Sequence, residues 1–387
     1  MASSEDALPT YGLYIDGGEV PSASGAHFPT DDPYTNQPWA RIARGNADDV
    51  NRAVAAAQRA FESGPWPRMT ATQRGQLLRK LGDLLALHAP RLGEIERRDN
   101  GKLAIEVTPQ IRYLADYVHY YAGLADKVQS EVIPSDKQGV FAYTKHEAKG
   151  VVAIITPWNS PLALTTWKLA PALAAGCTVV VKPSEYTSAS MVEFAKLFAE
   201  AGFPSGVVNV VTGFGQEVGE PLVTHPQVAH VGFTGGEGSG RKIYELAARD
   251  FKTVTLELGG KSPNIVFDDA DLDQAVKGVI AGIFAASGQT CIAGSRLLVQ
   301  AGIHDAFVQR LVEFMSTARM GDPALPDTQI APIATRPQFE KILSYIEIAQ
   351  GEGAHCELSG KPWLEPSGGI FVETTIFTGV NNRMRIH

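Results

Sequence analysis

The sequence predicts an α/β fold in which a parallel β-sheet is covered by helices on both faces and a second α/β unit follows. Short runs of β-branched residues bounded by Gly or Pro fill the middle of the chain, and helical stretches lie between them, as at 187–201 and 238–249. Strands and helices that alternate at this pitch are typical of a parallel sheet with both faces buried. The five strand candidates are 151–155, 178–181, 207–211, 230–233 and 254–258.

The elements before this region follow from turn residues and helical periodicity. The segment Tyr14–Gly18 contains Asp-Gly-Gly, which predicts a hairpin. From Asp48 onward, apolar residues recur at helical spacing, and residues 130–147 then alternate without a helical period, which predicts a projecting hairpin. Four tyrosines recur at helical spacing in between, and we interpret them as one packing face of a helix rather than a ligand site. They are Tyr113, Tyr117, Tyr120 and Tyr121.

The second α/β unit begins near Asn264. Its pattern predicts strands at 264–267 and 296–300 and helices at 271–285 and 304–317. The two units meet near Gly259-Gly260, and a cleft between such units is where ligands usually bind.

The charge balance and the cysteines exclude several classes of protein. The 387 residues carry 34 Lys and Arg against 42 Asp and Glu, and the net charge of −8 argues against bulk electrostatic binding of nucleic acid. No run approaches 18 apolar residues, so we expect no membrane span. Three cysteines, none at zinc-ligand spacing, exclude a disulfide framework and predict no metal site. The acidic start, MASSEDALPT, lacks the features of a secretory signal, so we expect a cytoplasmic protein.

Two glycine-rich turns are candidates for binding a dinucleotide. Gly213–Gly219 and Gly232–Gly240 each follow a strand and open a helix, although neither has the strict G-x-G-x-x-G spacing. Either turn can present N–H groups to a pyrophosphate, or can merely connect a strand to a helix. Lys182 and Glu185 follow another strand and can both reach ribose hydroxyls. The alternative is a solvated loop whose hydroxyl residues, Ser184 or Thr187, cap the next helix.

Cys291 is the sharper candidate for chemistry, because it lies between a helix and a strand in a segment rich in Gly, Ser and Ala, where a thiol is reachable. Cys177 lies in an apolar run and fits a buried, inert thiol, whereas Cys356, beside His355 in a hydrophilic turn-like stretch, fits a surface cysteine. Glu257 lies within an otherwise apolar strand. Its carboxylate is either paired structurally or held in an apolar setting that raises its pKa, as a general base requires.

Five motifs resemble those of the NAD(P)-dependent aldehyde dehydrogenase superfamily, in the family's order and at its spacing. The resemblance runs from about residue 10 to the last residue, and it implies a Rossmann-type cofactor domain, a second α/β catalytic domain and a small oligomerisation hairpin. The motifs are Pro157-Trp158-Asn159-Ser160-Pro161, Lys182-Pro183-Ser184-Glu185, Phe233-Thr234-Gly235-Gly236, Glu257-Leu258-Gly259-Gly260-Lys261 and Gly288-Gln289-Thr290-Cys291.

The resemblance implies how an aldehyde is oxidised to the carboxylic acid. Cys291 would attack the aldehyde carbon, and the Asn159 amide and the Cys291 backbone N–H would hold the oxyanion of the thiohemiacetal. Loss of hydride to the nicotinamide would leave a thioester, and Glu257 would activate the water that hydrolyses it. Lys168 would assist proton movement near Glu257.

The resemblance also implies an NAD site. Lys182 and Glu185 would hold the adenosine ribose, and Glu185 favours NAD, with NADP as the alternative. The turn that begins at Phe233 would hold the pyrophosphate. Gly236 replaces a frequent Ser there, so we expect looser cofactor binding. The implied cofactor residues are Ile155, Trp158, Lys182, Ser184, Glu185, Gly215, Phe233, Thr234, Gly235, Gly236 and Leu258.

Four residues match the family's substrate tunnel. Ser160 stands where an aromatic residue is frequent, so we expect a wide tunnel, with Trp167 as an aromatic wall. Arg112 and Tyr113 match the tunnel mouth, which suggests a bulky, aromatic or anionic aldehyde.

By the same resemblance, residues 1–124 and 148–256 would form the NAD-binding domain, 125–147 the oligomerisation hairpin and 257–387 the catalytic domain. The chain ends where the family continues into a Glu-x-Phe-Gly-Pro stretch, so we expect a C-terminally incomplete catalytic domain. The full-length protein would be a homodimer or homotetramer. Two alternatives stay open: a CoA-acylating relative, against which Glu257 argues, and an inactive, truncated or structural member that keeps only the fold.

Overall fold

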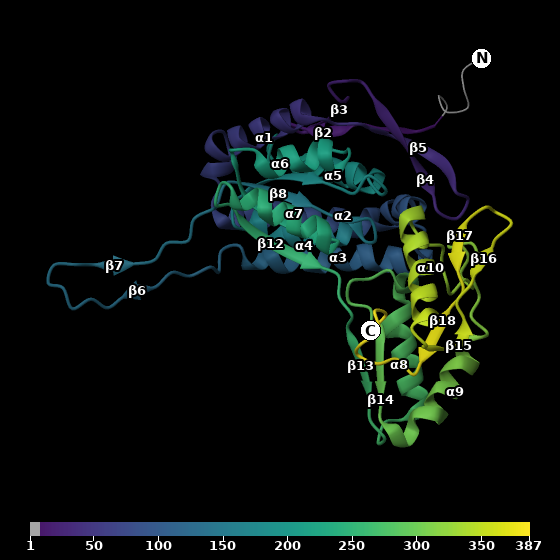
Figure 1. Cartoon of the computed structure of the whole chain (residues 1–387). Helices are drawn as coiled ribbons and strands as arrows, with labels where there is room; N and C mark the ends of the chain where they lie inside the picture. Colours follow the sequence, from purple (N-terminus) through teal and green to yellow (C-terminus); the bar gives the residue numbers. More distant parts are fainter. Residues whose placement is uncertain (1–7) are drawn as a thin grey trace, which may run out of the picture.

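The computed structural model describes residues 8–387 (Figure 1). Residues 1–7, part of the basis for predicting no secretory signal, lie outside this range. The helices are α1 (Ala47–Glu62), η2 (Trp66–Arg68), α2 (Ala71–Asn100), α3 (Ala104–Leu124), α4 (Pro161–Ala174), α5 (Ala189–Ala201), η3 (Gly215–Gly219), α6 (Glu220–Thr224), α7 (Glu237–Ala248), α8 (Leu272–Phe284), η4 (Ala285–Gly288), η5 (Ala301–Ile303), α9 (His304–Met315) and α10 (Arg336–Gly351).

The strands form one large sheet and several small ones. They are β1 (Thr10–Tyr11), β2 (Leu13–Ile15), β3 (Gly18–Val20), β4 (His27–Asp32), β5 (Gln37–Ala43), β6 (Val132–Ile133), β7 (Ala142–Tyr143), β8 (Val151–Ile155), β9 (Thr178–Lys182), β10 (Val208–Val210), β11 (Val228–Gly235), β12 (Thr253–Leu258), β13 (Pro263–Val266), β14 (Arg296–Val299), β15 (His355–Ser359), β16 (Pro362–Leu364), β17 (Ile370–Val372) and β18 (Thr375–Thr378).

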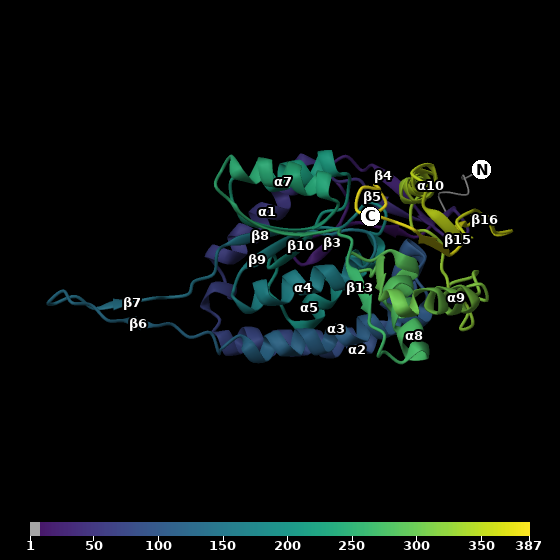
Figure 2. The same ribbon diagram turned by 60° about the horizontal axis from the view of Figure 1, so that its bottom comes forward.

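The large sheet confirms the predicted α/β fold. Its seven strands have the order β12-β11-β8-β9-β10-β2-β3, and the five strands from β12 to β10 are parallel. Helices α2, α3, α4 and α5 cover one face, and α1 and α7 cover the other (Figure 2). Strands β8 and β9 have neighbours on both sides and helices on both faces, so every residue in them is buried, whereas edge strand β12 alternates between exposed and half-buried residues.

The predicted hairpin at Tyr14–Gly18 is confirmed as the antiparallel pair β2–β3. Its two turn residues, Asp16 and Gly17, have φ values of 57° and 85°. Two successive left-handed residues form the type of turn that matches the twist of paired strands, and Asp-Gly is well suited to it.

The four tyrosines of α3 do not form the packing face that their spacing predicts. Tyr113 and Tyr120 are exposed, with relative accessibilities of 60% and 63%, while Tyr117 and Tyr121 are half-buried. The buried stripe of α3 is offset from the tyrosines by about one residue around the helix, and it includes Ile111, Leu114 and Val118. That aliphatic stripe faces the core beside α2 and α4, so the tyrosines are left at its margin.

The projecting hairpin predicted at 130–147 is confirmed. Strands β6 and β7 pair antiparallel, and Figure 1 shows them extending far from the rest of the molecule. The hairpin exposes several apolar side chains, with Val132 at 67%, Phe141 at 73% and Tyr143 at 62% relative accessibility.

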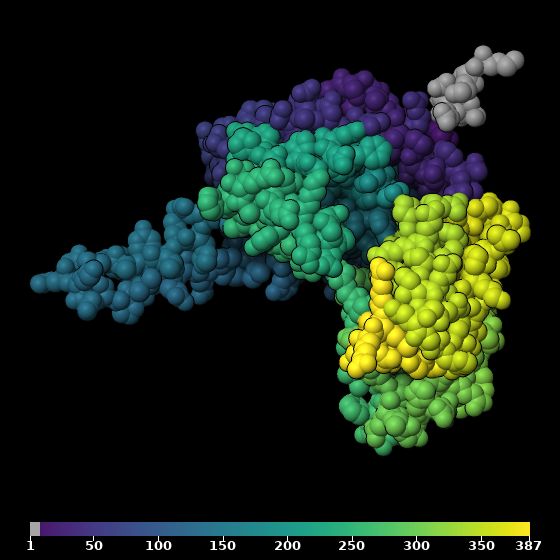
Figure 3. All heavy atoms as spheres, in the orientation of Figure 1, coloured from purple at the N-terminus to yellow at the C-terminus, as the bar shows by residue number. Residues whose placement is uncertain are grey.

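The chain after β12 builds a second hydrophobic core. Strands β13 and β14 pair in parallel, and α8 and α9 pack around Val266, Phe307 and Leu311. The surface is hollowed between the part over α7 and the part over α10 (Figure 3). The prediction for Cys356 is wrong in one respect: the residue lies half-buried in β15 and not in a turn, because it pairs with Phe377 of β18.

Candidate active site

The motifs meet at the carboxyl edge of the large sheet because parallel strands end there together. Register pairs Ile155 with Lys182 and with Phe233, and it pairs Gly235 with Leu258. Residues from three motifs, together with Ile155 just before a fourth, therefore lie side by side, although they are far apart along the chain. The carboxyl edge of an open α/β sheet is where ligands bind.

The turn between β11 and α7 has the form of an anion site. Gly235 ends β11, and a Cβ atom on it would lie 2.5 Å from the Phe233 ring, so any larger residue would displace that buried ring. Gly236 is the N-cap of α7 and provides no side-chain hydrogen bond to the first helical turn. The N–H groups of that turn are thus available to a phosphate, as at other helix N-termini.

Lys182 is buried at the end of β9. Its Nζ donates to Pro183 O at 2.9 Å and to Glu185 Oε2 at 3.4 Å. Burial lowers the pKa of Lys182, and the neighbouring Glu185 charge opposes that shift. The alternative in which Ser184 or Thr187 caps the next helix is not observed, since α5 has Ser188 at its N-cap and no side-chain capping bond from it.

The other cofactor candidates follow the same strands. Trp158 is half-buried in the loop after β8. Gly215 begins η3 after β10, and η3 lies beside Lys182, whose Cδ would be 3.7 Å from a Cβ atom on Gly219.

Asn159 joins this edge to the segment that carries Cys291. Its Nδ2 donates to Gln289 O at 2.8 Å, across 130 residues of sequence. Asn100 Nδ2 donates to the Asn159 carbonyl at 3.4 Å, which holds the backbone of the same loop. Cys291 follows Gln289 by two residues and is a half-buried, free thiol. Its reachable position agrees with the prediction, as does the burial of Cys177.

The turn before Cys291 is strained. Ala286 and Ser287 have φ values of 49° and 53°, in the left-handed region that non-glycine residues seldom adopt, and Gly288 follows at 77°. Two contacts hold the turn. The Ala286 N–H donates to the Glu106 carboxylate at 3.2 Å, and the Ser287 hydroxyl accepts the Ala331 N–H at 2.8 Å.

Lys168 shares its surroundings with Glu257 and Cys291. Its Nζ donates to Thr234 Oγ1, and Thr234 lies opposite Glu257 in the pairing of β11 with β12. Burial lowers the pKa of Lys168, while the charges of Glu257 and Cys291 favour its protonated form. Glu257 itself is exposed, so the apolar setting, one of the two alternatives for this carboxylate, is not observed. The reason is that β12 is an edge strand.

The substrate candidates divide into two groups. Ser160 is buried, and the buried Lys102 donates to its Oγ at 2.6 Å. Trp167 is 42% exposed, and its backbone carbonyl accepts a hydrogen bond from Tyr117 at 3.2 Å. Arg112 and Tyr113 are exposed on α3. The motifs contained no signal for Lys102 or Tyr117, because neither lies in one.

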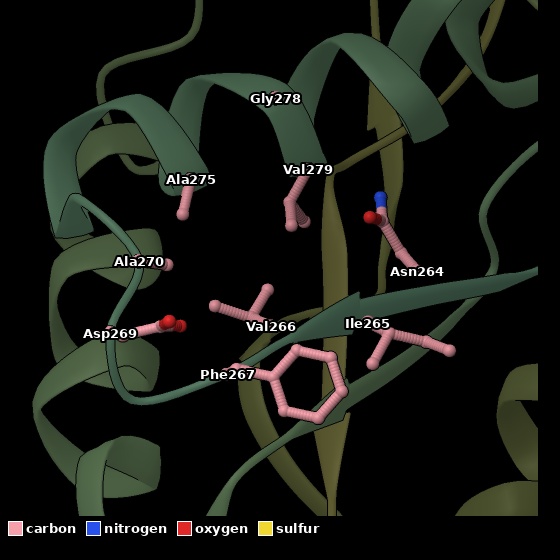
Figure 4. Close-up of a pocket in the computed structure, with 9 residues that line it drawn as sticks. All are labelled: Asn264, Ile265, Val266, Phe267, Asp269, Ala270, Ala275, Gly278 and Val279. Atoms are coloured by element: carbon pink, nitrogen blue, oxygen red, sulfur yellow. The ribbon is translucent and has the colours of Figure 1, made fainter.

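Residues 8–387 contain no helix long and apolar enough to cross a membrane, and no cluster of three His, Cys, Asp or Glu residues suited to a metal. A shallow hollow lies between β13 and α8, where Val266, Ala275 and Val279 face one another (Figure 4). None of the candidate site residues lines it.

The comparison with known proteins accounts for this arrangement. Residues 20–387 match the model of the aldehyde dehydrogenase family. The chain belongs to that family. It is 47% identical over 98% of its length to (Z)-2-((N-methylformamido)methylene)-5-hydroxybutyrolactone dehydrogenase of Acinetobacter baylyi, covering 78% of that protein. It is 43% identical over 97% of its length to aldehyde dehydrogenase 1A1 of Gallus gallus, covering 74% of it.

Solved aldehyde dehydrogenases have the same fold. The NAD+ complex of the Bacillus cereus enzyme matches the whole chain with a TM-score of 0.95 and 40% identity, and the chain covers 79% of it. Betaine aldehyde dehydrogenase from Staphylococcus aureus, also solved with NAD+, gives a TM-score of 0.95 and 39% identity over 98% of the chain and 76% of its own. The reaction class is therefore NAD(P)-dependent oxidation of an aldehyde, and the CoA-acylating and inactive alternatives are not favoured.

Proposed function

We propose that this protein oxidises an aldehyde to a free carboxylic acid through covalent intermediates on Cys291, with NAD as the cofactor. The observation that carries the proposal is the hydrogen bond from Asn159 Nδ2 to Gln289 O, which brings an amide donor beside the segment that carries the thiol. A nucleophile with a neighbouring oxyanion donor is the arrangement that attack on a carbonyl requires.

The cofactor residues of this chain fit NAD. The uncapped first turn of α7 after Gly235 would receive the pyrophosphate, and the buried Lys182 with Glu185 would hold the adenosine ribose. The remaining contacts would come from Ile155, Trp158, Ser184, Gly215, Phe233, Thr234, Gly236 and Leu258. NAD, when bound, supplies the hydride acceptor.

The protein residues then divide the work. Cys291 attacks the aldehyde carbon, and Asn159 together with the Cys291 backbone N–H holds the oxygen that becomes negative. Loss of hydride leaves a thioester on Cys291. Glu257, exposed at the end of β12, takes a proton from the water that hydrolyses this thioester. The half-buried Lys168 donates to Thr234 and is influenced by the Glu257 charge, so it keeps a proton donor near the base.

The substrate is proposed to be a bulky or polar aldehyde. Ser160 leaves more space than an aromatic side chain would, and its hydroxyl is linked to the Lys102 ammonium. One relative is named for a substituted 5-hydroxybutyrolactone, which is in keeping with a site that accepts oxygen-rich carbonyl compounds.

An aldehyde panel tests the proposed function. The purified protein should form NADH, followed by absorbance, with at least one of a set of aliphatic, aromatic, hydroxylated and carboxylated aldehydes, and the product should be the acid whether or not coenzyme A is present. Acid formation that requires coenzyme A, or no NADH with any aldehyde, would contradict the proposal.

We predict that Glu185→Ser moves the cofactor preference from NAD toward NADP. The carboxylate beside Lys182 repels a 2′-phosphate, so its loss should change the NAD/NADP ratio of kcat/KM roughly tenfold or more, about 1.4 kcal/mol. Glu200→Ser, which removes an exposed carboxylate from α5, is the matched control and should leave the ratio unchanged. An unchanged ratio in Glu185→Ser would place this carboxylate away from the ribose.

Domain organisation, assembly and location are further proposals. The separate core around Val266 and Phe307 supports a catalytic domain at 257–387, with 1–124 and 148–256 binding the cofactor, although β12 crosses that boundary.

An isolated two-stranded hairpin with exposed apolar side chains is only marginally stable, so 125–147 is proposed to pair with a second copy in a homodimer or homotetramer. Light scattering measures the oligomeric state and tests this proposal.

The three free thiols support a reducing, cytoplasmic location, which cell fractionation would test.

A further inference from the structure

The Asn159 amide is held from one side. Its Nδ2 donates to Gln289 O at 2.8 Å, while its Oδ1 is buried and has no hydrogen-bond partner within residues 8–387. The side-chain amide nitrogen of Asn carries two hydrogens. Because the Gln289 carbonyl accepts one of them, the orientation of the amide is set and its second N–H remains for another acceptor.

The backbone carbonyl of Gln289 is kept in place by hydrogen bonds that the side chain and the N–H of the same residue make. Its Nε2 donates to Pro332 O at 3.2 Å, and its Oε1 accepts the Ala334 N–H at 2.9 Å. Its backbone N–H donates to Ala286 O at 3.1 Å. The side chain thus spans two backbone groups of a separate segment, and its Nε2 also makes a longer bond to Ala286 O of its own turn, at 3.4 Å. None of these contacts takes part in the proposed reaction.

We propose that Gln289 is a positioning residue for the oxyanion hole. Its side chain, anchored on Pro332 and Ala334, fixes its carbonyl, and the carbonyl turns the Asn159 amide so that the free N–H faces the reacting oxygen. The inference rests on the proposed function, in which Asn159 binds that oxygen. A donor that is already oriented stabilises the developing charge without reorganisation, whereas a freely turning amide loses part of this effect.

Ser287 provides a matched control on the same turn. Its hydroxyl accepts the Ala331 N–H at 2.8 Å, so it ties the same turn to the same segment. It makes no hydrogen bond to Asn159 or to the Gln289 carbonyl. If the slowing came from general loosening of the turn, Ser287→Ala would show it as well, whereas loss of amide orientation should appear only in Gln289 variants.

Two reactions of Cys291 that need no dinucleotide separate positioning from structural damage. Iodoacetamide alkylates the thiolate at carbon with loss of iodide, and no oxyanion forms. With p-nitrophenyl acetate, the thiolate attacks the carbonyl carbon, a tetrahedral oxyanion forms, and the C–O bond breaks with its electron pair leaving on p-nitrophenolate. Only the second reaction uses the Asn159 amide.

We expect Gln289→Met to slow the first turnover with p-nitrophenyl acetate roughly ten- to hundredfold, since small misplacements of a catalytic group can have costs of this order. Alkylation by iodoacetamide and the thermal unfolding midpoint should stay close to those of the unaltered protein, and Ser287→Ala should change neither rate. Gln289→Glu keeps the acceptor for the Ala334 N–H, so its rate with p-nitrophenyl acetate should fall less. It takes the place of Gln289→Met if that variant does not fold. Equal slowing of both reactions would overturn the proposal.

A double-mutant cycle decides whether Gln289 acts through Asn159. Asn159→Ala should slow acylation about 10²- to 10³-fold, and Gln289→Met should then cost nothing further in that background. Fully additive losses would overturn the positioning role and leave the proposed function standing. No effect of Asn159→Ala would overturn the oxyanion assignment on which both rest.

Discussion

Cys291→Ala should abolish NADH formation while the protein still binds NAD. The thiol forms the covalent bond to the aldehyde, so its loss removes the reaction path and should lower kcat by at least about a thousandfold. The cofactor candidates lie at the strand ends and around α7, and removal of one sulfur atom from the η4–β14 segment leaves them in place. Stopped-flow NADH absorbance and NAD titration by fluorescence measure the two effects.

Cys356→Ala is the matched control for this variant. Cys356 is also a free, half-buried thiol, but it lies in β15, and its Sγ contacts the carbonyls of Leu358 and Ser359, which belong to no motif. Its replacement should leave both turnover and NAD binding unchanged. Turnover of Cys291→Ala within tenfold of the unaltered protein would be incompatible with a cysteine nucleophile at this position.

Glu257→Gln should separate the two halves of the reaction. Formation of the thioester needs Cys291 and Asn159, whereas its hydrolysis needs a base for water. The amide keeps the shape of Glu257 and cannot take a proton, so steady-state turnover should fall about 10²- to 10⁴-fold while the first NADH forms as a burst. Rapid mixing with NAD and an aldehyde measures the burst and the slow phase in one trace.

The surroundings of Lys168 raise a second possible role for Glu257, in ionising the Cys291 thiol, and the same experiment distinguishes the two roles. The Glu257 charge favours protonation of Lys168, and the Cys291 charge acts on Lys168 in the same direction. If Glu257 also helps to ionise the thiol, both phases should slow together and the burst should disappear. Glu245→Gln, an exposed carboxylate on α7, is the control and should change neither phase. An unaltered steady-state rate in Glu257→Gln would remove this residue from the mechanism.

Local patterns were sufficient to predict the elements, and the motifs were sufficient to name the candidate site residues. The β-branched runs became β8 to β12, because a strand buried on both faces has a composition that can be recognised without its neighbours. The Asp-Gly turn and the extended segment at 130–147 were predictable for the same local reason. Motif order alone placed the cofactor candidates at strand ends, and parallel pairing then brought those ends together.

Strand order and long-range contacts decided the remainder. Nothing within Thr253–Leu258 indicates that β12 is the edge of the sheet, and that position is why Glu257 is exposed. Helical spacing groups the α3 tyrosines on one side, but it does not say which stripe packs inward; Ile111 and Leu114 do so because α2 and α4 cover that side.

The sequence by itself determined the α/β class, which depends on residue type and local spacing, and its motifs named the candidate residues, with Cys291 as the proposed reactive thiol. The tertiary structure alone decided that Asn159 donates to Gln289, that Gln289 is anchored on the segment at Pro332, and that Lys102 reaches Ser160. Such contacts join residues tens to more than a hundred positions apart, and hydrogen bonds of this kind depend on distances of about 3 Å that no periodicity encodes.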